Sequence, residues 1–206
     1  MTAQDRPLTR IQARNRAAIM AAGLEVFSQY GFRGATLDQV AEAARLSKPN
    51  LLYYFPSKDA IYTALLEQLL DTWLDPLKEL RADGEPVAEI LGYVRRKLDM
   101  SRDFPRESRL FANEILQGAP HIAPHLAGDL KALVDDKAAL IRGWAEAGHI
   151  AEVDPHHLIF SIWALTQHYA DFDVQVRAVL GRDDPFPGAA RHLDQLFRSL
   201  LSPRDG

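Results

Sequence analysis

The sequence predicts an all-α protein, with an N-terminal three-helix helix-turn-helix domain and a larger C-terminal helical domain. Apolar residues recur at helical spacing along the 206 residues, and no segment alternates apolar and polar residues as a half-buried strand would. Prolines stand at the predicted start of most of the later helices. With 47% hydrophobic residues, the chain can bury a sizeable core.

The first predicted helix is long and amphipathic and runs from about Thr9 to Tyr30. Gly31 is expected to close it, because glycine adopts the left-handed conformation of a helix C-terminus at little cost. One stripe of this helix is apolar and is expected to face the core: Ile19, Ala22, Val26, Phe27 and Tyr30.

Two short helices are predicted next. Thr36 is a candidate N-cap for a helix over 37–44, and Ser47 for a helix over 48–54, where Pro49 falls in the first turn and its missing N–H does no harm. A long helix followed by two short ones across a tight turn is typical of a helix-turn-helix, whose second short helix enters the major groove. That helix is KPNLLYY, and Lys48, Asn50 and its two tyrosines put hydrogen-bond donors on it.

Ser57 is expected to cap a long fourth helix that runs to about Arg81, is bent by Pro76 and links the two parts. Further helices are predicted over 86–102, 105–117, 128–147, 155–180 and 187–201. We therefore divide the chain into a DNA-binding domain over 1–59 and an effector-binding and dimerisation domain over 60–206.

Charge is distributed unevenly between these parts. Residues 1–62 contain eight Lys or Arg against five Asp or Glu, a net charge of +3, and the remaining residues contain 16 against 23, a net charge of −7. Because neutralising phosphates is the sequence-independent part of nucleic-acid affinity, this asymmetry favours DNA contact by the first part alone.

Composition excludes several other classes of protein. The chain has no cysteine, which rules out disulfides, thiolate zinc sites and cysteine nucleophiles. Neither a secretory signal nor an apolar run of about 20 residues is present, so we expect a soluble cytoplasmic protein. No metal and no cofactor is expected.

The segment ATLDQVAEAARLSKPNLLYYFPSKDAIY resembles the DNA-binding domain of the TetR family of transcriptional regulators. The resemblance implies an operator-binding repressor that forms dimers and is released from DNA by a small effector. It also implies phosphate contacts at helix N-termini and base contacts from the recognition helix. The residues implicated in DNA binding are Arg14, Arg33, Thr36, Ser47, Lys48, Asn50, Tyr53, Tyr54 and Lys58.

Polar side chains on the later apolar helices indicate a small-molecule pocket, because burying them without partners costs stability. They are Trp73, Arg109, Glu114, Trp163, Gln167, His168 and Tyr169. An amide such as that of Gln167 complements an N–H/C=O edge, and an indole offers a flat stacking face. A small planar lactam or imide fits this chemistry.

Three further segments, SRDFPRESRLF, GDLKALVDDKAALI and DPHHLIFSIWALTQHYADF, resemble one subgroup of the TetR family, the pyrimidine-utilisation repressors. The resemblance covers about residues 13–179, and the N-terminal arm and the segment after Gly181 depart from it. It implies that the effector is uracil or thymine. When ligand-binding positions are transferred to the matching segments of this chain, the resemblance implies ligand contacts from Trp73 and Gln167, followed by Trp163, Tyr169 and Arg109.

The region over 155–180 carries a heptad-like seam with spacings of 4, 3, 4, 3 and 4. With apolar residues of the last helix, this seam predicts half of an intermolecular four-helix bundle, the arrangement that the TetR resemblance implies. A core within one chain is the alternative. Two-fold symmetry would place two recognition helices about 34–36 Å apart and require a nearly palindromic operator. The seam consists of Leu158, Ile162, Leu165, Tyr169, Phe172 and Val176, and the apolar residues of the last helix are Leu193, Leu196, Phe197 and Leu200.

Three other readings are open. These alternatives are a TetR-like regulator of another small-molecule pathway, a helical enzyme, and an interaction protein with the same fold and no effector. The enzyme reading would use Glu114 and Asp171 as an acid/base pair, or histidines as metal ligands. It is disfavoured because the adjacent His156 and His157 diverge by about 100° on a helix, and because no phosphate loop or nucleophile motif is present.

Overall fold

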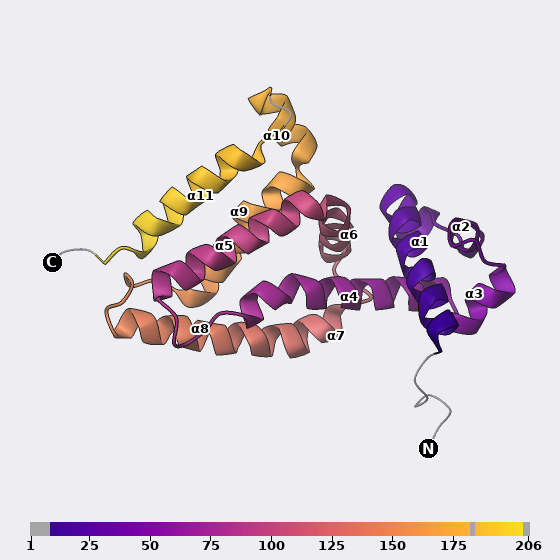
Figure 1. The fold of residues 1–206 in the computed structure, drawn as a ribbon, viewed down its shortest axis with the longest axis horizontal. Helices are drawn as coiled ribbons and strands as arrows, with labels where there is room; N and C mark the ends of the chain where they lie inside the picture. The colour runs from indigo at the N-terminus through magenta and orange to yellow at the C-terminus, as the bar shows by residue number, and fades with distance from the viewer. Residues whose placement is uncertain (1–8, 182–183, 204–206) are drawn as a thin grey trace, which may run out of the picture.

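A computed structural model describes residues 9–181 and 184–203, and its regular elements over these ranges are helices (Figure 1). The N-terminal helices are α1 (Arg10–Gly34), α2 (Leu37–Ala43), α3 (Lys48–Tyr54) and α4 (Lys58–Lys78). They are followed by α5 (Pro86–Asp103), α6 (Pro105–Leu116), α7 (Ala123–His125), the π-helical turn η1 (Leu126–Leu130), α8 (Lys131–Glu146), α9 (Pro155–Asp171), α10 (Asp173–Leu180) and α11 (Phe186–Leu201). The predicted all-α class is confirmed.

The predicted caps of the short helices are confirmed. Thr36 Oγ1 accepts from the Gln39 amide at 3.2 Å, and Gln39 Oε1 accepts from the Thr36 amide at 2.8 Å, which makes a reciprocal capping box. Ser47 Oγ and Ser57 Oγ cap α3 and α4 without a reciprocal bond, by accepting from the backbone N–H of Asn50 and of Ala60. These side chains fix where α2, α3 and α4 begin.

Three helix boundaries differ from the prediction. Gly31, with φ of 66°, interrupts the regular helix as expected, but helical turns resume beyond it and α1 extends to Gly34. The helix predicted over 155–180 is two helices, because the non-helical backbone of Phe172 separates α9 from α10. The helix predicted from 128 begins earlier, through α7 and η1.

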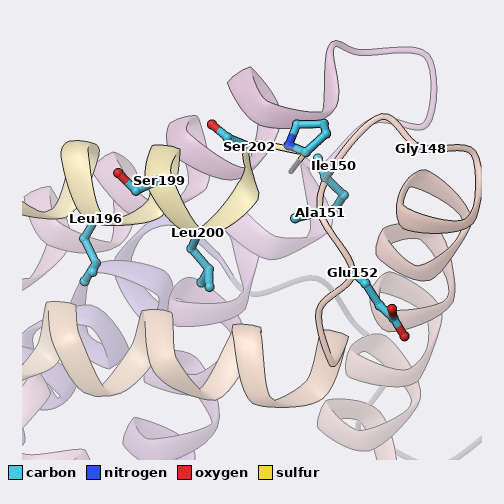
Figure 2. Close-up of a pocket in the computed structure, with 9 residues that line it drawn as sticks. Gly148, Ile150, Ala151, Glu152, Leu196, Ser199, Leu200 and Ser202 are labelled. Carbon is cyan, nitrogen blue, oxygen red and sulfur yellow. The ribbon is translucent and has the colours of Figure 1, made fainter. Parts of the chain in front are cut away.

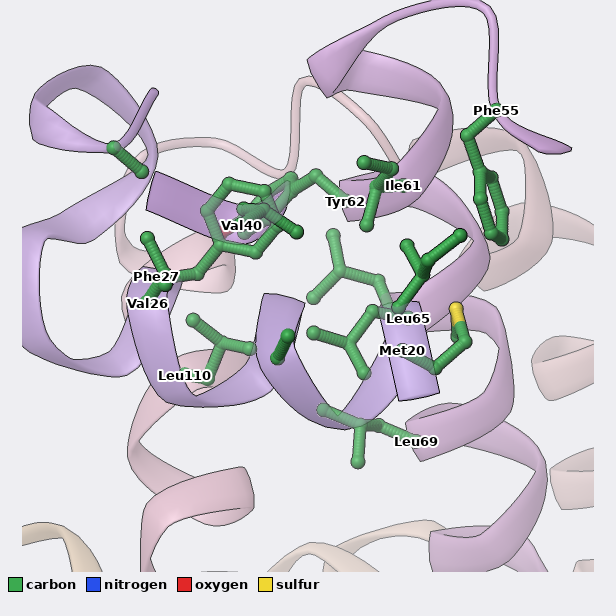
Figure 3. Close-up of a cluster of buried hydrophobic side chains, with 14 of the residues drawn as sticks. Met20, Val26, Phe27, Val40, Phe55, Ile61, Tyr62, Leu65, Leu69 and Leu110 are labelled. Carbon is green, nitrogen blue, oxygen red and sulfur yellow. The ribbon is translucent and has the colours of Figure 1, made fainter. Parts of the chain in front are cut away.

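Two hydrophobic cores build the molecule. The first joins α1, α2, α3 and most of α4, and it also takes in Leu110, Ala119 and Ile122 from α6 and the loop that follows it (Figure 3). The second joins α5, α8, α9 and α11 with the end of α4. The elements α4 and α6 therefore connect the three-helix N-terminal unit to the helices behind it.

None of the helices in the described ranges is long and apolar enough to cross a membrane.

Candidate functional site

The helix α3 has one buried and one exposed face. Leu51 and the cap residue Phe55 are almost fully buried, which fixes α3 on the first core. Lys48, Asn50 and Tyr53 are exposed, and Tyr53 retains 70% of its accessible surface. The helix therefore presents an ammonium, an amide and a phenol on the side away from the core.

Lys48 forms an ion pair with Asp38 of α2, with 2.9 Å between Nζ and Oδ2. Both side chains are largely exposed to solvent, at 46% for Lys48 and 70% for Asp38. An exposed pair of this kind contributes only about 0–1 kcal/mol. Lys48 can therefore exchange this carboxylate for another acceptor at little cost.

The tyrosines Tyr53 and Tyr54 are held by the N-terminal turns of α1. Gln12 Nε2 donates to Tyr53 Oη at 3.2 Å, and Asn15 Nδ2 donates to Tyr54 Oη at 3.1 Å. Because each phenolic oxygen accepts one of these hydrogen bonds, its own proton is left to donate to an outside acceptor. Tyr53 is exposed and Tyr54 is half-buried, so both belong to the same surface as the exposed face of α3.

The other residues expected to bind DNA are divided between the helix ends and α1. Thr36 and Ser47 lie exposed at the N-termini of α2 and α3, where both hydroxyls already act as caps. Arg14 lies exposed in the first half of α1, and Arg33 lies exposed at its end.

The structure gives Lys58 a different role from the phosphate contact expected of it. Lys58 Nζ donates to the carbonyl oxygens of Phe32 at 2.7 Å and Ala35 at 3.0 Å, and it lies 4.5 Å from the centroid of the Phe32 ring. The side chain therefore joins the start of α4 to the end of α1. Two of its three donors are used inside the protein.

A second candidate site is a small cavity of about 60 Å³ between the first and second cores. It opens into a groove of about 570 Å³ between α6, the α7–η1 corner and α9. Phe111, Leu130, Trp163 and Gln167 line both spaces, so the groove leads to the cavity. The cavity is completed by Leu70, Trp73, Leu74 and Lys97.

Three of the five predicted ligand residues, Trp73, Trp163 and Gln167, line the cavity. Arg109 lies at the rim of the outer groove, where Nη1 donates to the carbonyl of Ala170 at 3.3 Å. Tyr169 does not line either space. Its ring packs 6.1 Å from that of Phe186, because the turn of α9 that carries it directs it into the second core.

The hydrogen-bonding groups that line the cavity differ in whether they have a partner within the protein. Trp163 Nε1 donates to Tyr93 Oη at 2.6 Å, so this indole offers the cavity its ring alone. Trp73 Nε1 is buried and has no hydrogen-bond partner among the described residues.

The residue that the sequence prediction missed is Lys97, which lines the cavity and is 2% exposed. Burial lowers the pKa of Lys97 to about 7.

A sequence signal for Lys97 existed. The buried face of α5 includes Ile90, Val94, Leu98 and Ser101, and Lys97 falls on the same stripe. A lysine on the apolar stripe of an amphipathic helix is unusual, because lysine is rarely buried without a partner.

Glu114 and His168, expected near the pocket, lie elsewhere. Glu114 is buried at the α6–α7 corner, where it accepts from the backbone N–H of His121 at 2.7 Å and lies 3.2 Å from His121 Nδ1. The His121 ring packs against Tyr62 of α4, and burial together with Glu114 raises the pKa of Tyr62. His168 is exposed and stacks on Phe172, with ring centroids 5.1 Å apart.

The alternative that the chain is an enzyme required Glu114 and Asp171 to act as an acid/base pair, or histidines to bind a metal, and the structure does not show either arrangement among the described residues. Asp171 accepts from Ser108 at 2.6 Å, whereas Glu114 accepts from the backbone N–H of His121, so the two carboxylates have different partners. Within 9–181 and 184–203, no group of three or more metal-ligating side chains could hold an ion.

The predicted dimer seam is divided between the inside of the chain and its surface. Leu158, Ile162 and Val176 of the seam are buried, as are Leu193 and Phe197 of α11. The reason is that α9 and α11 both pack against α5, so this face of each helix forms an intrachain core. The seam residues Leu165, Phe172, Leu196 and Leu200 remain exposed, as does Phe160 of α9, which was not part of the predicted seam.

Leu196 and Leu200 line a groove between α11 and the loop over 148–152, and Figure 2 shows both side chains pointing away from the α11 ribbon toward the neighbouring helix. This groove therefore leaves two apolar side chains of α11 partly without cover.

Comparison with known families and proteins places these sites in context. Residues 19–65 match the family model described as bacterial regulatory proteins of the tetR family, and residues 66–204 match the model described as the C-terminal region of YcdC-like proteins. The HTH-type transcriptional regulator RutR of Escherichia coli K12 is 56% identical over 181 residues, which cover 86% of this chain and 85% of that protein. The HTH-type transcriptional repressor NicS of Pseudomonas putida is 27% identical over 66% of this chain and 63% of that protein.

Solved structures share the fold. The transcriptional regulator SCO4942 of Streptomyces coelicolor superimposes with a TM-score of 0.74 at 23% identity, covering 92% of this chain and 99% of that one. AibR, solved in complex with isovaleryl coenzyme A and operator DNA, superimposes with a TM-score of 0.66 at 17% identity, covering 92% of this chain and all of that one.

Proposed function

The chain belongs to the TetR family of transcriptional regulators, and we propose that it is a dimeric repressor released from a nearly palindromic operator by a pyrimidine base, uracil or thymine. The family relationship makes it a DNA-binding regulator and not an enzyme. A repressor acts where the chromosome lies, so the proposal implies the cytoplasm. The observation that carries the proposal is the exposed donor face of α3 together with a cavity at the edge of the first core. The helices α4 and α6 belong to both regions.

The DNA contacts that we propose follow from this face. Lys48 and Asn50, in the first turn of α3, would reach base edges in the major groove. Tyr53 and Tyr54 would donate to phosphates from the positions in which α1 holds them. We retain the N-termini capped by Thr36 and Ser47 and the exposed Arg14 and Arg33 as backbone contacts, and we leave Lys58 out.

We propose that the dimer forms through α9 and α11, by way of the exposed part of the predicted seam together with Phe160, and not through the buried part of that seam. Phe160 and Leu165 on α9 and Leu196 and Leu200 on α11 supply apolar surface that a two-fold-related copy would cover. The proposed DNA-binding domain over 1–59 and effector domain over 60–206 meet within the first turn of α4.

The effector proposal rests on the cavity and on the resemblance to pyrimidine-utilisation repressors. A one-ring heterocycle suits a small space that is lined by Trp73 and Trp163 and carries the Gln167 amide. Gln167 offers a donor and an acceptor side by side, which complements the N–H/C=O edge of an imide. In this arrangement the indoles supply flat apolar contact and Gln167 sets the orientation.

Two elements are placed to transmit occupancy of the cavity to the DNA-binding domain. In α4, Trp73 lines the cavity and Lys58 is bonded to the end of α1. In α6, Phe111 lines the cavity and its neighbour Leu110 is buried in the first core. A ligand that favours one position of these helices would change the spacing of the two α3 helices in the dimer. Coupling of about 1–3 kcal/mol is typical of such systems.

Substitution Gln167→Leu tests the effector proposal. The variant should remain a dimer and bind operator DNA normally, since Gln167 lies on α9 and not in the proposed DNA-binding domain, but uracil should no longer release it. The measurement is operator affinity by fluorescence anisotropy, with and without uracil or thymine. Normal release of the variant by either base would show that the Gln167 amide is not the ligand edge.

A further inference from the structure

The corner between α6 and α7 holds a buried carboxylate that the proposed DNA and ligand contacts do not use. Glu114, in the last turn of α6, is 2% exposed. Its Oε1 accepts from the backbone N–H of His121 at 2.7 Å, and its Oε2 lies 3.2 Å from His121 Nδ1. Burying a carboxylate costs stability unless hydrogen bonds compensate for it. His121 supplies such compensation from both its backbone and its ring.

The ring of His121 contacts two helices of the first core. Its centroid lies 4.6 Å from that of Phe32 on α1 and 4.9 Å from that of Tyr62 on α4. The rings of Phe32 and Tyr62 are themselves 4.8 Å apart, so the three rings form one cluster. His121 Nε2 also lies 3.8 Å from Asp59 Oδ1 at the start of α4. The corner therefore contacts α1 directly and not only through α4.

The backbone on either side of His121 is anchored in the same core. Ala119 and Ile122 are buried among the residues of the first core. Ala119 has φ of 55°, a left-handed conformation that alanine keeps only where surrounding contacts hold it there. The corner is thus fixed against the DNA-binding domain by its buried residues and by the ring of His121.

The helix α6 carries the other end of this contact to the cavity. Phe111, which lies one turn before Glu114, lines the cavity. Because residues three apart lie on adjacent turns of one helix, a displacement of α6 at Phe111 carries Glu114 with it. At the other end of the contact, Phe32 precedes Thr36, the cap of α2, by four residues. The contact therefore runs from the cavity to the start of the helix-turn-helix.

We propose that Glu114 and His121 are positioning residues that couple the two domains. Glu114 carries movement of α6 to His121, and the ring of His121 passes it to Phe32 and so to α2 and α3. This inference rests on the proposed function in one respect, that occupancy of the cavity moves α6. Without the pair, DNA and effector should each still bind, but neither should change the affinity for the other, because coupling is reciprocal.

The test is the operator affinity of the full-length dimer with and without saturating uracil, measured by fluorescence anisotropy. His121→Phe keeps an aromatic ring against Phe32 and Tyr62 and removes the imidazole that faces Glu114. The ratio of the two affinities should fall from at least about tenfold in the wild type to less than about threefold in this variant. Operator affinity without uracil, and uracil affinity without DNA, should each stay within about threefold of the wild type.

A second variant and a matched control accompany this measurement. Glu114→Leu removes the same contact from the side of α6 and should lower the ratio equally, so either variant serves if the other does not fold. His156→Phe removes a histidine that lies 3.1 Å from Asp135 and joins α9 to α8, and it should keep the wild-type ratio. A purely structural role would change stability or the single affinities and leave the ratio unchanged.

A second readout needs no effector. A DNA site selected from a random library should change the hydrogen exchange of the α9 amides around Gln167 in the wild type and not in His121→Phe. If uracil has no effect on the wild type but this DNA-dependent change is present and requires His121, the pyrimidine effector is wrong and the coupling contact stands. If His121→Phe responds to uracil or to DNA as the wild type does, or if neither affects the wild type, the coupling contact is wrong.

Discussion

Lys58 Nζ donates a 2.7 Å hydrogen bond to the carbonyl oxygen of Phe32, so the first residue of α4 is bonded to the last turns of α1. The same ammonium lies over the Phe32 ring, and Phe32 in turn packs against Tyr62 and His121. A lysine at the border of the DNA-binding domain thereby holds the domain to the helix that leaves it. We infer that Lys58 contributes to DNA affinity only through the position of the domain.

Substitution Lys58→Met should destabilise the protein by about 1–3 kcal/mol, because it leaves the carbonyls of Phe32 and Ala35 without a donor. Urea unfolding at fixed protein concentration measures the change. The dependence of DNA affinity on salt should keep its slope, since no phosphate contact is lost. A slope reduced by about one, with normal stability, would restore the phosphate contact that the sequence predicted.

Substitution Lys48→Ala should reduce preference for the operator over random DNA by about 1–3 kcal/mol, because a base contact from α3 is lost. The measurement is the ratio of the two affinities at one salt concentration. Lys78→Ala is a matched control, because Lys78 has an equally exposed side chain paired with Asp75 at 3.0 Å, but lies at the far end of α4. Equal effects of the two variants would remove Lys48 from the base-reading face.

Substitution Leu200→Glu should raise the dimer dissociation constant by about 100-fold or more, because two-fold symmetry buries the introduced charge twice. Analytical ultracentrifugation across a range of concentrations measures it. Ile11→Glu places the same charge on an exposed apolar residue of α1, a helix that lies at the opposite end of the molecule from α11 (Figure 1), and should leave the dimer intact. A Leu200→Glu protein that dimerises normally would rule out the exposed α9/α11 face.

Substitution Lys97→Met should stabilise the ligand-free protein at pH 7 by about 1–4 kcal/mol, because a buried amine that has no ion-pair partner among the described residues is replaced by an apolar side chain. Burial lowers the pKa of Lys97 from 10.5 to about 7, so between these values the unfolded chain binds more protons than the folded one. Wild-type stability from this residue therefore rises with pH across that window. The difference between variant and wild type should shrink from pH 7 toward pH 10, and a constant difference would contradict the burial of an ionisable amine.

The parts of the fold that depend on local chemistry were predictable. Thr36, Ser47 and Ser57 cap helices through backbone groups three residues away, so the sequence positions them without knowledge of tertiary structure. The same holds for the exposed donors of α3, whose opposite face carries Leu51 for the core.

The parts that depend on tertiary packing were not predictable in the same way. Both faces of α9 are apolar, so periodicity predicted a partner for Leu158 and Ile162 without showing that it is α5 of the same chain. The carbonyl partners of Lys58 are 23 and 26 residues away in sequence. Lys97 was overlooked because lysine is ordinarily a surface residue, although its place on the apolar stripe of α5 marked it as an exception.

The central claim is that occupancy of the cavity controls how the α3 helices meet DNA. Its most direct test is the affinity of the wild-type dimer for a DNA site selected from a random library, measured at constant salt with and without saturating uracil. The account predicts a nearly palindromic site, a preference over random DNA of about 1,000-fold or more, and a loss of at least about tenfold in affinity when uracil is added. A selected site without two-fold symmetry, or an affinity that neither uracil nor thymine changes, would contradict it.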